Sequence, residues 1–424
     1  MHTEPMAGRA GTPSTAGTST APDPTVPGDA SADPASADAA PPGDIDTAGT
    51  PATTARRPEA RRSFGHHPAL DGLRGLAILL VLLNHSGIGL WSDAEPWLAP
   101  GGALGVHLFF VLSGLLIASL LLGEQARTGG INLRAFAGRR VRRLVPTLVV
   151  LLVALAAAAL VLDHLVLRDV ASSAAYVLTF TANWSAVGFP LAPLERAFGG
   201  GTMVVETLQT WSLAIEVHFY LLWSLALWAA VRCGWSHRRM AVATALAIAV
   251  IAGVRAASYA GGTDWFTLYA STYSRLDAAL VGTLVGIAYM AGWLRPSRRL
   301  TAAGWAGLAA LLVMAVVDDG SSPALPLGLY TVLAGGAAAG MAAVLTDPTS
   351  RLGRVLTMRW LMFLGTVSYS VYLWHQGVFL LFQLHAPSWA GPVRLVVGVT
   401  VALLVSTASY HLVERRFMRR RSAA

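Results

Sequence analysis

Apolar stretches of roughly 20 residues, separated by short polar segments, dominate the chain between residues 70 and 413. A helix needs about 20 apolar residues to cross the hydrocarbon core of a bilayer. The pattern therefore predicts an all-α, polytopic membrane bundle of about ten transmembrane helices. The predicted spans cover residues 70–90, 103–122, 145–166, 209–231, 240–257, 271–293, 301–317, 325–346, 360–384 and 391–413.

Arginine clusters occur at every second connection between these spans. Because arginine is enriched in cytoplasmic loops, this alternation predicts that both termini are cytoplasmic. An eleventh span would move the last cluster outside, so we interpret residues 170–182 as interfacial or re-entrant. The clusters lie at residues 56–62, 139–143, 232–239, 295–299, 351–359 and 415–421.

The composition changes at both ends of the predicted bundle. Residues 1–63 are rich in Ala, Pro, Thr, Gly, Asp and Ser and contain few large apolar side chains. Such segments cannot bury enough apolar surface to fold, so they are predicted to form a disordered cytoplasmic tail. Residues 64–418 are predicted to form the transmembrane domain, and residues 419–424 a short basic tail.

The composition also excludes several classes of protein. Charged residues make up 13% of the 424 residues, whereas a soluble domain has about 25%. The net charge of +8 does not indicate a nucleic-acid-binding face, because the arginines are divided among the connections between spans. The single cysteine, Cys233, excludes a disulfide within the chain and a cysteine-based zinc cluster.

Small residues at helical spacing predict where helices pack closely. Gly282-x-x-x-Gly286 and Gly336-x-x-x-Gly340 fall within two of the predicted spans. Glycines four residues apart let the backbones of two membrane helices approach each other.

Arg74 and His85 are the most informative pair of polar residues in the apolar spans. They are eleven residues apart in the first span, which places them on one helix face about 16 Å apart along the axis. Ionisable groups within a membrane are costly unless they face the bundle interior or a wet cavity. An imidazole can accept a hydroxyl proton and return it. Arg74 alone could be a snorkelling anchor and His85 alone an interfacial histidine.

The start of the fourth span contains a second group of polar residues. Ser212, Glu216 and Tyr220 recur every four residues and therefore share a helix face. A carboxylate at this depth favours a functional role over a structural pairing. His218 lies on another face, where packing is an equally good interpretation.

Two further groups lie in the sixth and ninth spans. Arg275-Leu-Asp277 either forms a local ion pair or contributes to a site. Tyr372 and His375 are three residues apart and face together, although His375 could also be a satisfied core histidine.

The cluster Arg139-Arg-Val-Arg-Arg-Leu-Val-Pro146 is by default a solvated orientation signal. Pro146 is placed near the start of the third span, where proline is tolerated. As a functional alternative, the cluster could bind the phosphates of a nucleotide-bearing acyl donor. The sequence has no Gly-x-Ser-x-Gly elbow, no Walker loop and no zinc-ligand motif. The remaining His, Glu, Tyr and Arg residues suit acid–base group transfer, and no metal is predicted.

These segments, in this order, resemble the acyltransferase family 3 membrane proteins of bacteria. The resemblance covers about residues 67–418. Two positions depart from the family pattern: His218 stands where Gln is usual, and Arg416 where Pro is common. The resembling segments are Leu70–Gly75 with His85, Phe109–Gly114, Arg139–Pro146, Trp211–Tyr220, Arg275–Asp277, Ser368–His375 and Glu414–Phe417.

The resemblance implies an integral-membrane O-acyltransferase. Such an enzyme would transfer an acyl group, usually acetyl from acetyl-CoA, to a carbohydrate hydroxyl of a cell-envelope glycan or a glycosylated metabolite. The expected partners are the lipid bilayer of the bacterial plasma membrane, an acyl-CoA donor and a carbohydrate acceptor, with no nucleic acid.

The resemblance also implies roles for individual residues. His85 would be the general base or a transient acyl carrier, and Glu216 would orient or charge-stabilise His85. Arg74 would position the donor together with Arg139, Arg140 and Arg143. The residues expected to contact substrate or support the site are Ser113, Trp211, Ser212, Tyr220, Arg275, Asp277, Tyr372 and His375.

Two other classes of protein fit the same polar residues. A proton-coupled transporter could use Arg74, His85, Glu216 and Asp277 as a relay. A polysaccharide polymerase or ligase is the third possibility. A transporter would need no thioester, so labelled acetyl-CoA and a glycan acceptor distinguish it from an acyltransferase.

Overall fold

The computed structural model of the chain describes residues 64–89, 99–163, 165–186, 203–318 and 320–419. These residues are helical or irregular, with no strand among them, and they belong to one compact unit. The all-α prediction is therefore confirmed. The predicted tail at 1–63, and residues 420–424 of the predicted basic tail, lie outside the described residues.

Long helices dominate the described chain, and short helical turns link some of them. The long helices are α1 (Pro68–Gly89), α2 (Leu104–Thr128), α3 (Leu133–Ala158), α7 (Thr210–Arg232), α8 (His237–Ala260), α10 (Thr272–Met290), α11 (Arg298–Val317), α12 (Tyr330–Thr346), α14 (Arg359–His385) and α15 (Gly391–Ser409). The shorter elements are α4 (Leu167–Leu178), α5 (Ala182–Ala186), η1 (Val205–Thr207), α9 (Trp265–Ala270), η2 (Leu325–Leu329), α13 (Arg351–Leu356), η3 (Tyr410–Glu414) and α16 (Arg415–Arg419).

A helix occupies each of the predicted spans. Eight of the described helical segments are long and apolar enough to cross a membrane. The other two predicted spans, α10 and α14, have 19 and 27 residues but include several buried polar side chains. Segment α4 has 12 residues and would rise only about 18 Å, which is too short to cross the hydrocarbon core.

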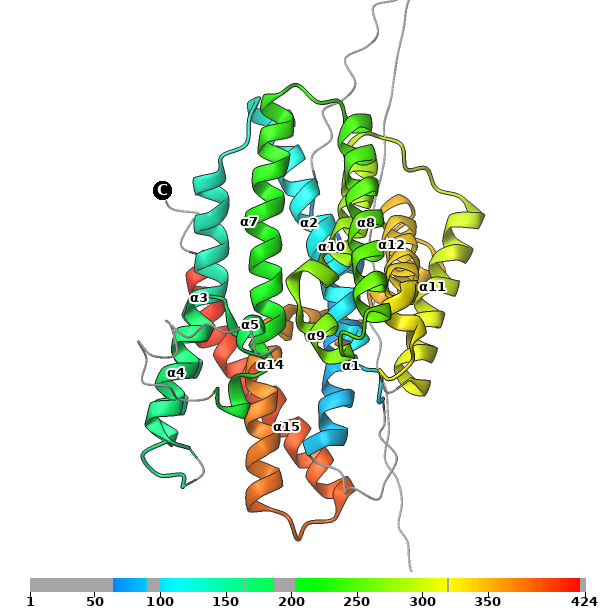
Figure 1. The fold of residues 1–424 in the computed structure, drawn as a ribbon. Helices are drawn as coiled ribbons and strands as arrows, with labels where there is room; N and C mark the ends of the chain where they lie inside the picture. Colours follow the sequence, from blue (N-terminus) through cyan, green and yellow to red (C-terminus); the bar gives the residue numbers. More distant parts are fainter. Residues whose placement is uncertain (1–63, 90–98, 164, 187–202, 319, 420–424) are drawn as a thin grey trace, which may run out of the picture. The chain divides into compact units, whose positions relative to one another are not determined.

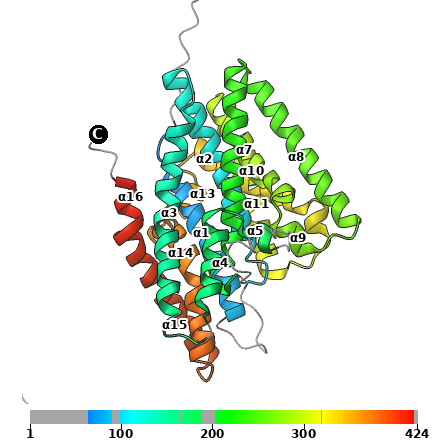
Figure 2. The same cartoon turned by 60° about the vertical axis from the view of Figure 1, so that its left-hand side comes forward.

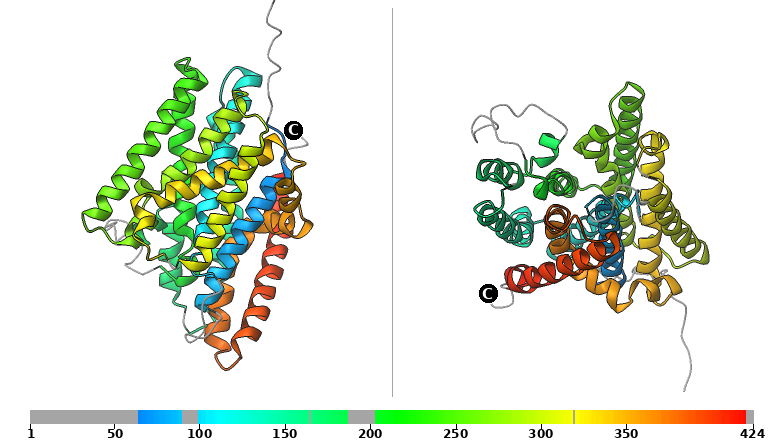
Figure 3. Two further views of the ribbon diagram at one scale, coloured as in Figure 1. Left: turned by 90° about the vertical axis from the view of Figure 1, so that its right-hand side faces the viewer. Right: turned by 90° about the horizontal axis from the view of Figure 1, so that it is seen from below.

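Successive long helices run in opposite directions (Figure 1). The α2–α3 and α7–α8 connections lie at one end, and the α14–α15 connection lies at the other. From their shared end, α7 and α8 diverge, and α8 slopes away from the other helices (Figure 2). Helices α1 and α2 are central. In their most apolar stretch of 18 residues, 67% and 78% of the residues are buried, whereas the corresponding share is 22% in α8, α11 and α15. Figure 3 shows both among the surrounding helices.

Glycines allow the backbones of three helix pairs to touch. A Cβ atom on Gly365 of α14 would lie 1.8 Å from the Asp71 carbonyl oxygen of α1. One on Gly282 of α10 would lie 1.8 Å from the carbonyl oxygen of Val111 in α2. The predicted motif glycines are confirmed as close contacts, because Gly336 also meets Gly307 of α11.

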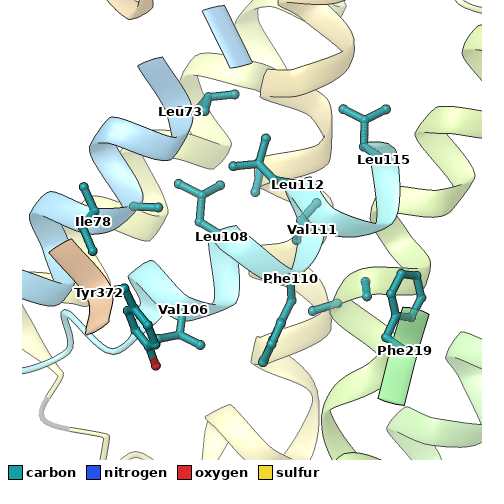
Figure 4. Close-up of a cluster of buried hydrophobic side chains, with 14 of the residues drawn as sticks. Leu73, Ile78, Val106, Leu108, Phe110, Val111, Leu112, Leu115, Phe219 and Tyr372 are labelled. Carbon is teal, nitrogen blue, oxygen red and sulfur yellow. The ribbon is translucent and has the colours of Figure 1, made fainter. Parts of the chain in front are cut away.

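Apolar side chains fill the space between α1 and α2. Leu73 and Ile78 of α1 face Leu108 and Leu112 of α2, and none of the four is more than 1% exposed. Figure 4 shows these side chains with Tyr372 of α14 beside them. This packing fixes the two helices that carry Arg74, His85 and Ser113.

The third predicted span begins earlier than its hydropathy indicates. Helix α3 starts at Leu133, where the Asn132 side chain accepts a hydrogen bond from the Ala135 N–H (2.9 Å). The prediction that Pro146 lies near the helix start is therefore wrong, because Pro146 is in the helix interior. The arginines at 139–143 are consequently on a helix rather than in a solvated loop.

Candidate active site

A cavity lies between α1, α2, α3, α7 and α14. About 770 Å³ of space within its outline, part of it open to solvent, is free of protein atoms. Apolar side chains from α2 cover one wall, and the polar groups come from the other helices and from Ser113 of α2. The polar lining consists of Arg74, Ser113, Arg140, Arg143, Ser212, Glu216, Tyr220, Ser368, Tyr369 and Tyr372.

Glu216 accepts hydrogen bonds from two other side chains that line this cavity. Its Oε1 accepts hydrogen bonds from the Ser113 hydroxyl of α2 and from the Tyr220 hydroxyl one turn along α7. The Arg140 guanidinium lies over the Tyr220 ring, 5.3 Å from its centroid. Two donors and a nearby cation suit an ionised carboxylate. The structure thus brings together four residues that the sequence places on two spans and in the arginine cluster between the second and third spans.

Three arginines line the cavity from two helices. Arg74 comes from α1, while Arg140 and Arg143 share a face of α3 because they are three residues apart. Within the described part of the chain, none of the three forms an ion pair with a carboxylate, and the buried Nε of Arg140 has no hydrogen-bond partner. The negative charges that act on Arg74 come from Asp71, Glu414 and Glu216. These three guanidinium groups could therefore bind an anion.

Arg139 does not belong to this group. Its guanidinium pairs with Glu124 at the end of α2 (3.2 Å), and its side chain is 37% exposed. It does not line the cavity. The structure therefore separates Arg139 from Arg140 and Arg143, although the sequence grouped all three as donor-binding residues.

His85 lies against His375 of α14. The His375 Nε2 and His85 Nδ1 atoms are 3.3 Å apart, and the ring centroids are 5.0 Å apart. His375 is fully buried, whereas His85 is half-buried. The sequence named both residues but gave no reason to place them together.

Tyr372 lines the cavity and also lies beside the histidine pair, and neither histidine lines the cavity. The Tyr372 hydroxyl lies 2.5 Å from the Ser212 hydroxyl and donates to the Gln209 carbonyl oxygen (2.7 Å). The Tyr372 and His375 ring centroids are 5.8 Å apart. Among the described residues, no hydrogen bond joins Glu216 to His85, so the expected pairing is absent from this structure.

Asp277 pairs with an arginine that the sequence analysis did not identify. Its Oδ2 accepts a hydrogen bond from Arg255 NH1 of α8 (2.8 Å), and both side chains are fully buried. Of the two alternatives for Arg275-Leu-Asp277, the local ion pair is therefore wrong, because side chains two residues apart on a helix do not face each other. Arg255 carried a detectable signal, because it is a lone charge in the apolar segment 240–257.

Arg275 contacts aromatic rings and a histidine. Its NH2 group lies 3.2 Å from His107 Nδ1, and its guanidinium lies 4.1 Å from the centroid of the Tyr330 ring and 4.9 Å from that of Tyr269. The Trp211 ring also packs against Tyr269, with the centroids 4.7 Å apart. Arg275, Asp277 and Trp211 do not line the cavity. They therefore belong to a polar network beside it.

Two other predicted positions have defined surroundings. The His218 Nδ1 atom is 2.9 Å from the Thr272 hydroxyl, and its ring stacks on Trp184. Glu414 in the last motif is 2% exposed and accepts a hydrogen bond from the Ser370 hydroxyl (3.0 Å). Neither residue lines the cavity.

Comparison with known proteins gives an independent view of the chain. A family model described as an acyltransferase domain, that of acyltransferase family 3, matches residues 67–411. YrhL of Bacillus subtilis, a candidate peptidoglycan O-acetyltransferase, is 30% identical over 362 residues, which are 82% of this chain and 55% of YrhL. No solved structure matches the chain significantly.

Two relatives named OatA are similar over the same part of the chain. The peptidoglycan O-acetyltransferase OatA of Listeria monocytogenes is 26% identical over 84% of this chain and 56% of its own length. The O-acetyltransferase OatA of Staphylococcus aureus is 27% identical over 85% of this chain and 58% of its own length. The chain thus spans little more than half the length of these curated relatives.

Proposed function

The chain belongs to acyltransferase family 3, and from that premise we propose that it transfers an acetyl group from acetyl-CoA to a carbohydrate hydroxyl at a bacterial plasma membrane. The observation that carries the proposal is the cavity in which Arg74, Arg140 and Arg143 face Glu216 without pairing with a carboxylate. The relatives named as O-acetyltransferases support acetyl as the transferred group.

The arginines are suited to bind the phosphates of an acyl-CoA donor. Guanidinium groups bind phosphate oxygens in a bidentate manner, and they stay charged even when partly buried. Glu216 would balance part of the positive charge when the donor is absent and hold the Ser113 and Tyr220 hydroxyls in place. Arg139, which already pairs with Glu124, is left out of this role.

His85 would act as general base on the acceptor. The hydroxyl oxygen forms a bond to the thioester carbonyl carbon while its proton passes to His85. The carbon–sulfur bond then breaks, and His85 returns the proton to the departing thiolate, which leaves as free CoA. Tyr372 lines the cavity and lies beside His375, and its hydroxyl contacts that of Ser212, so these two side chains would line the path of the acyl group.

The acceptor class is a cell-envelope glycan, and the relatives named as peptidoglycan O-acetyltransferases favour peptidoglycan. The test uses the purified full-length protein in liposomes with acetyl-labelled CoA and soluble peptidoglycan fragments. Formation of an alkali-labile acetyl ester on the glycan is the expected result. Release of label without an ester, or uptake of unmodified glycan, would reject the proposal and favour hydrolysis or transport.

Arg74→Lys should raise the KM for acetyl-CoA about tenfold. Lysine keeps the positive charge but loses the planar pair of donors that grips a phosphate, and a tenfold effect corresponds to about 1.4 kcal/mol. Initial rates at varied donor concentrations would measure it, with Arg142→Lys on the exposed face of α3 as the matched control. If the KM for acetyl-CoA and the kcat both stay unchanged, Arg74 does not bind the donor and is better explained as an interfacial anchor.

The natural cysteine reports the proposed orientation. Cys233 is exposed where α7 ends, beside the α7–α8 connection, which the arginine distribution assigns to the cytoplasm. A membrane-impermeant maleimide should label Cys233 in inverted vesicles but not in intact cells. Labelling in intact cells would reverse the proposed topology, and Cys233→Ser provides the blank.

A further inference from the structure

We propose that His375 is a positioning residue for His85: together with the Val81 carbonyl it holds the proton on His85 Nδ1, and it stabilises the imidazolium that forms when His85 takes the acceptor proton. The inference rests on the proposed function, because it assigns a partner to the general base of that reaction. It follows from the geometry of two imidazoles that meet between α1 and α14.

The contacts of the two rings are few and directional. His85 Nδ1 lies 3.1 Å from the Val81 carbonyl oxygen on its own helix and 3.3 Å from His375 Nε2. His375 Nδ1 lies 2.9 Å from the Val371 carbonyl oxygen on its own helix. Each ring thus directs its Nδ1 at a carbonyl one turn earlier in the chain.

These contacts determine the tautomers. A carbonyl oxygen only accepts hydrogen bonds, so each Nδ1 must carry the proton. The Nε2 of neutral His375 then has a free lone pair directed at His85 Nδ1, and the N–H of His85 is shared between Val81 and His375. Shared donors of this kind are common near helix carbonyls. The consequence is that Nε2 is the basic nitrogen of His85.

Among the described residues, no carboxylate forms a hydrogen bond with His85 that would compensate its charge. Within the described residues, its hydrogen bonds involve only Val81 and His375, and the rings nearest to His375 are those of His85, Tyr372 and Phe379. A histidine that binds a metal through one ring nitrogen usually donates a hydrogen bond from its other ring nitrogen to a carboxylate, a carbonyl oxygen or a water. Catalytic histidines are often oriented in the same way. Here a neutral imidazole supplies that acceptor.

The hydrogen bond between the rings should strengthen as the reaction proceeds. His85 becomes a cation when the hydroxyl proton reaches its Nε2, and hydrogen bonds from ionised donors are about twice as strong as neutral ones. The proton on Nδ1 stays on His85, so no second transfer is needed. A distance of 3.3 Å is long for the resting state, as is common before substrate binds.

Two substitutions at residue 375 separate this role from packing. His375→Phe keeps an aromatic ring but removes the acceptor, and it should lower kcat about tenfold, equivalent to about 1.4 kcal/mol. His375→Gln offers an amide oxygen to His85 Nδ1 and should recover most of that loss. The KM values for acetyl-CoA and for the glycan should stay within about twofold of wild type in both variants.

The controls make each outcome decisive. His218→Gln applies the same exchange to a half-buried histidine on α7 and should leave kcat unchanged. If the Phe variant does not fold, as judged by gel filtration, His375→Leu replaces it. The proposal would be overturned if His375→Phe kept the wild-type kcat. It would also be overturned if His375→Phe and His375→Gln lost the same amount of kcat and both had raised KM values. If wild-type protein makes no acetyl ester, the proposed function itself fails.

Discussion

Replacing His85 by alanine should lower kcat for acetyl transfer about 10²- to 10⁴-fold, the range that a general acid–base group supplies. The variant loses the nitrogen that accepts the hydroxyl proton, so the uncharged hydroxyl must attack the thioester unaided. Donor and acceptor binding should change little, because the arginines and hydroxyls of the cavity remain. The rate of ester formation by purified protein in liposomes is the measurement.

The same preparations show whether His85→Ala acts on chemistry alone. Its level in the membrane, its gel-filtration profile and its retention on a CoA affinity resin should match those of wild type. Asn84→Ala on the same turn is the control for altered packing, since within the described residues the Asn84 amide donates to the carbonyl oxygens of Ala99 and Pro100 (3.2 and 2.7 Å) and to no group of the proposed site. A rate within about threefold of wild type would remove His85 from the mechanism.

Arg255→Leu should destabilise the folded protein by about 3–5 kcal/mol, the usual cost of leaving a buried charge without its partner. Arg255 binds four groups: Asp277, the Thr331 hydroxyl, and the carbonyl oxygens of Ser274 and Pro326, all at 2.8–3.1 Å. Each would lose the hydrogen bond that Arg255 donates to it, and Asp277 would keep the one from the Thr331 hydroxyl. The midpoint of thermal unfolding in detergent, followed by tryptophan fluorescence, is the measurement.

A double variant distinguishes charge from packing. Arg255→Leu with Asp277→Leu removes both members of the ion pair and leaves the net charge of the network unchanged. It should recover much of the stability lost in the single variant, because apolar replacements of buried pairs are often neutral. If the single variant unfolds at the wild-type temperature, the pair makes no net contribution to stability.

The helices could be predicted well from the sequence, because each helix that crosses a bilayer needs an apolar segment of its own. It misplaced the start of α3, since residues 133–143 are helical but polar, and hydropathy detects only the part of a helix that lies in apolar surroundings. The eleven residues before the apolar segment begin at the Asn132 cap, a signal that the run of arginines obscured. That extension is what brings Arg140 and Arg143 to the cavity.

Contacts between helices were much harder to predict than the helices. Spacing along one helix correctly grouped Glu216 with Tyr220, which share a hydrogen bond. It could not indicate that Ser113 supplies the second donor, or that His85 meets His375, which lies 290 residues away. Such pairings depend on how each helix is rotated about its axis, and all faces of these apolar helices look alike in sequence. The Arg255–Asp277 pair shows the same limit.

The glycine contacts between α1 and α14 affect how the protein should respond to its bilayer. Membrane helices accommodate a thicker or thinner lipid layer mainly by tilting. With Gly75 and Gly365 in backbone contact, α1 and α14 have no gap in which to tilt separately, so they should tilt as a unit. The spacing of His85 and His375, a few turns further along, would then be insensitive to lipid chain length. Changes in membrane thickness should instead alter how far a glycan must reach to meet His85.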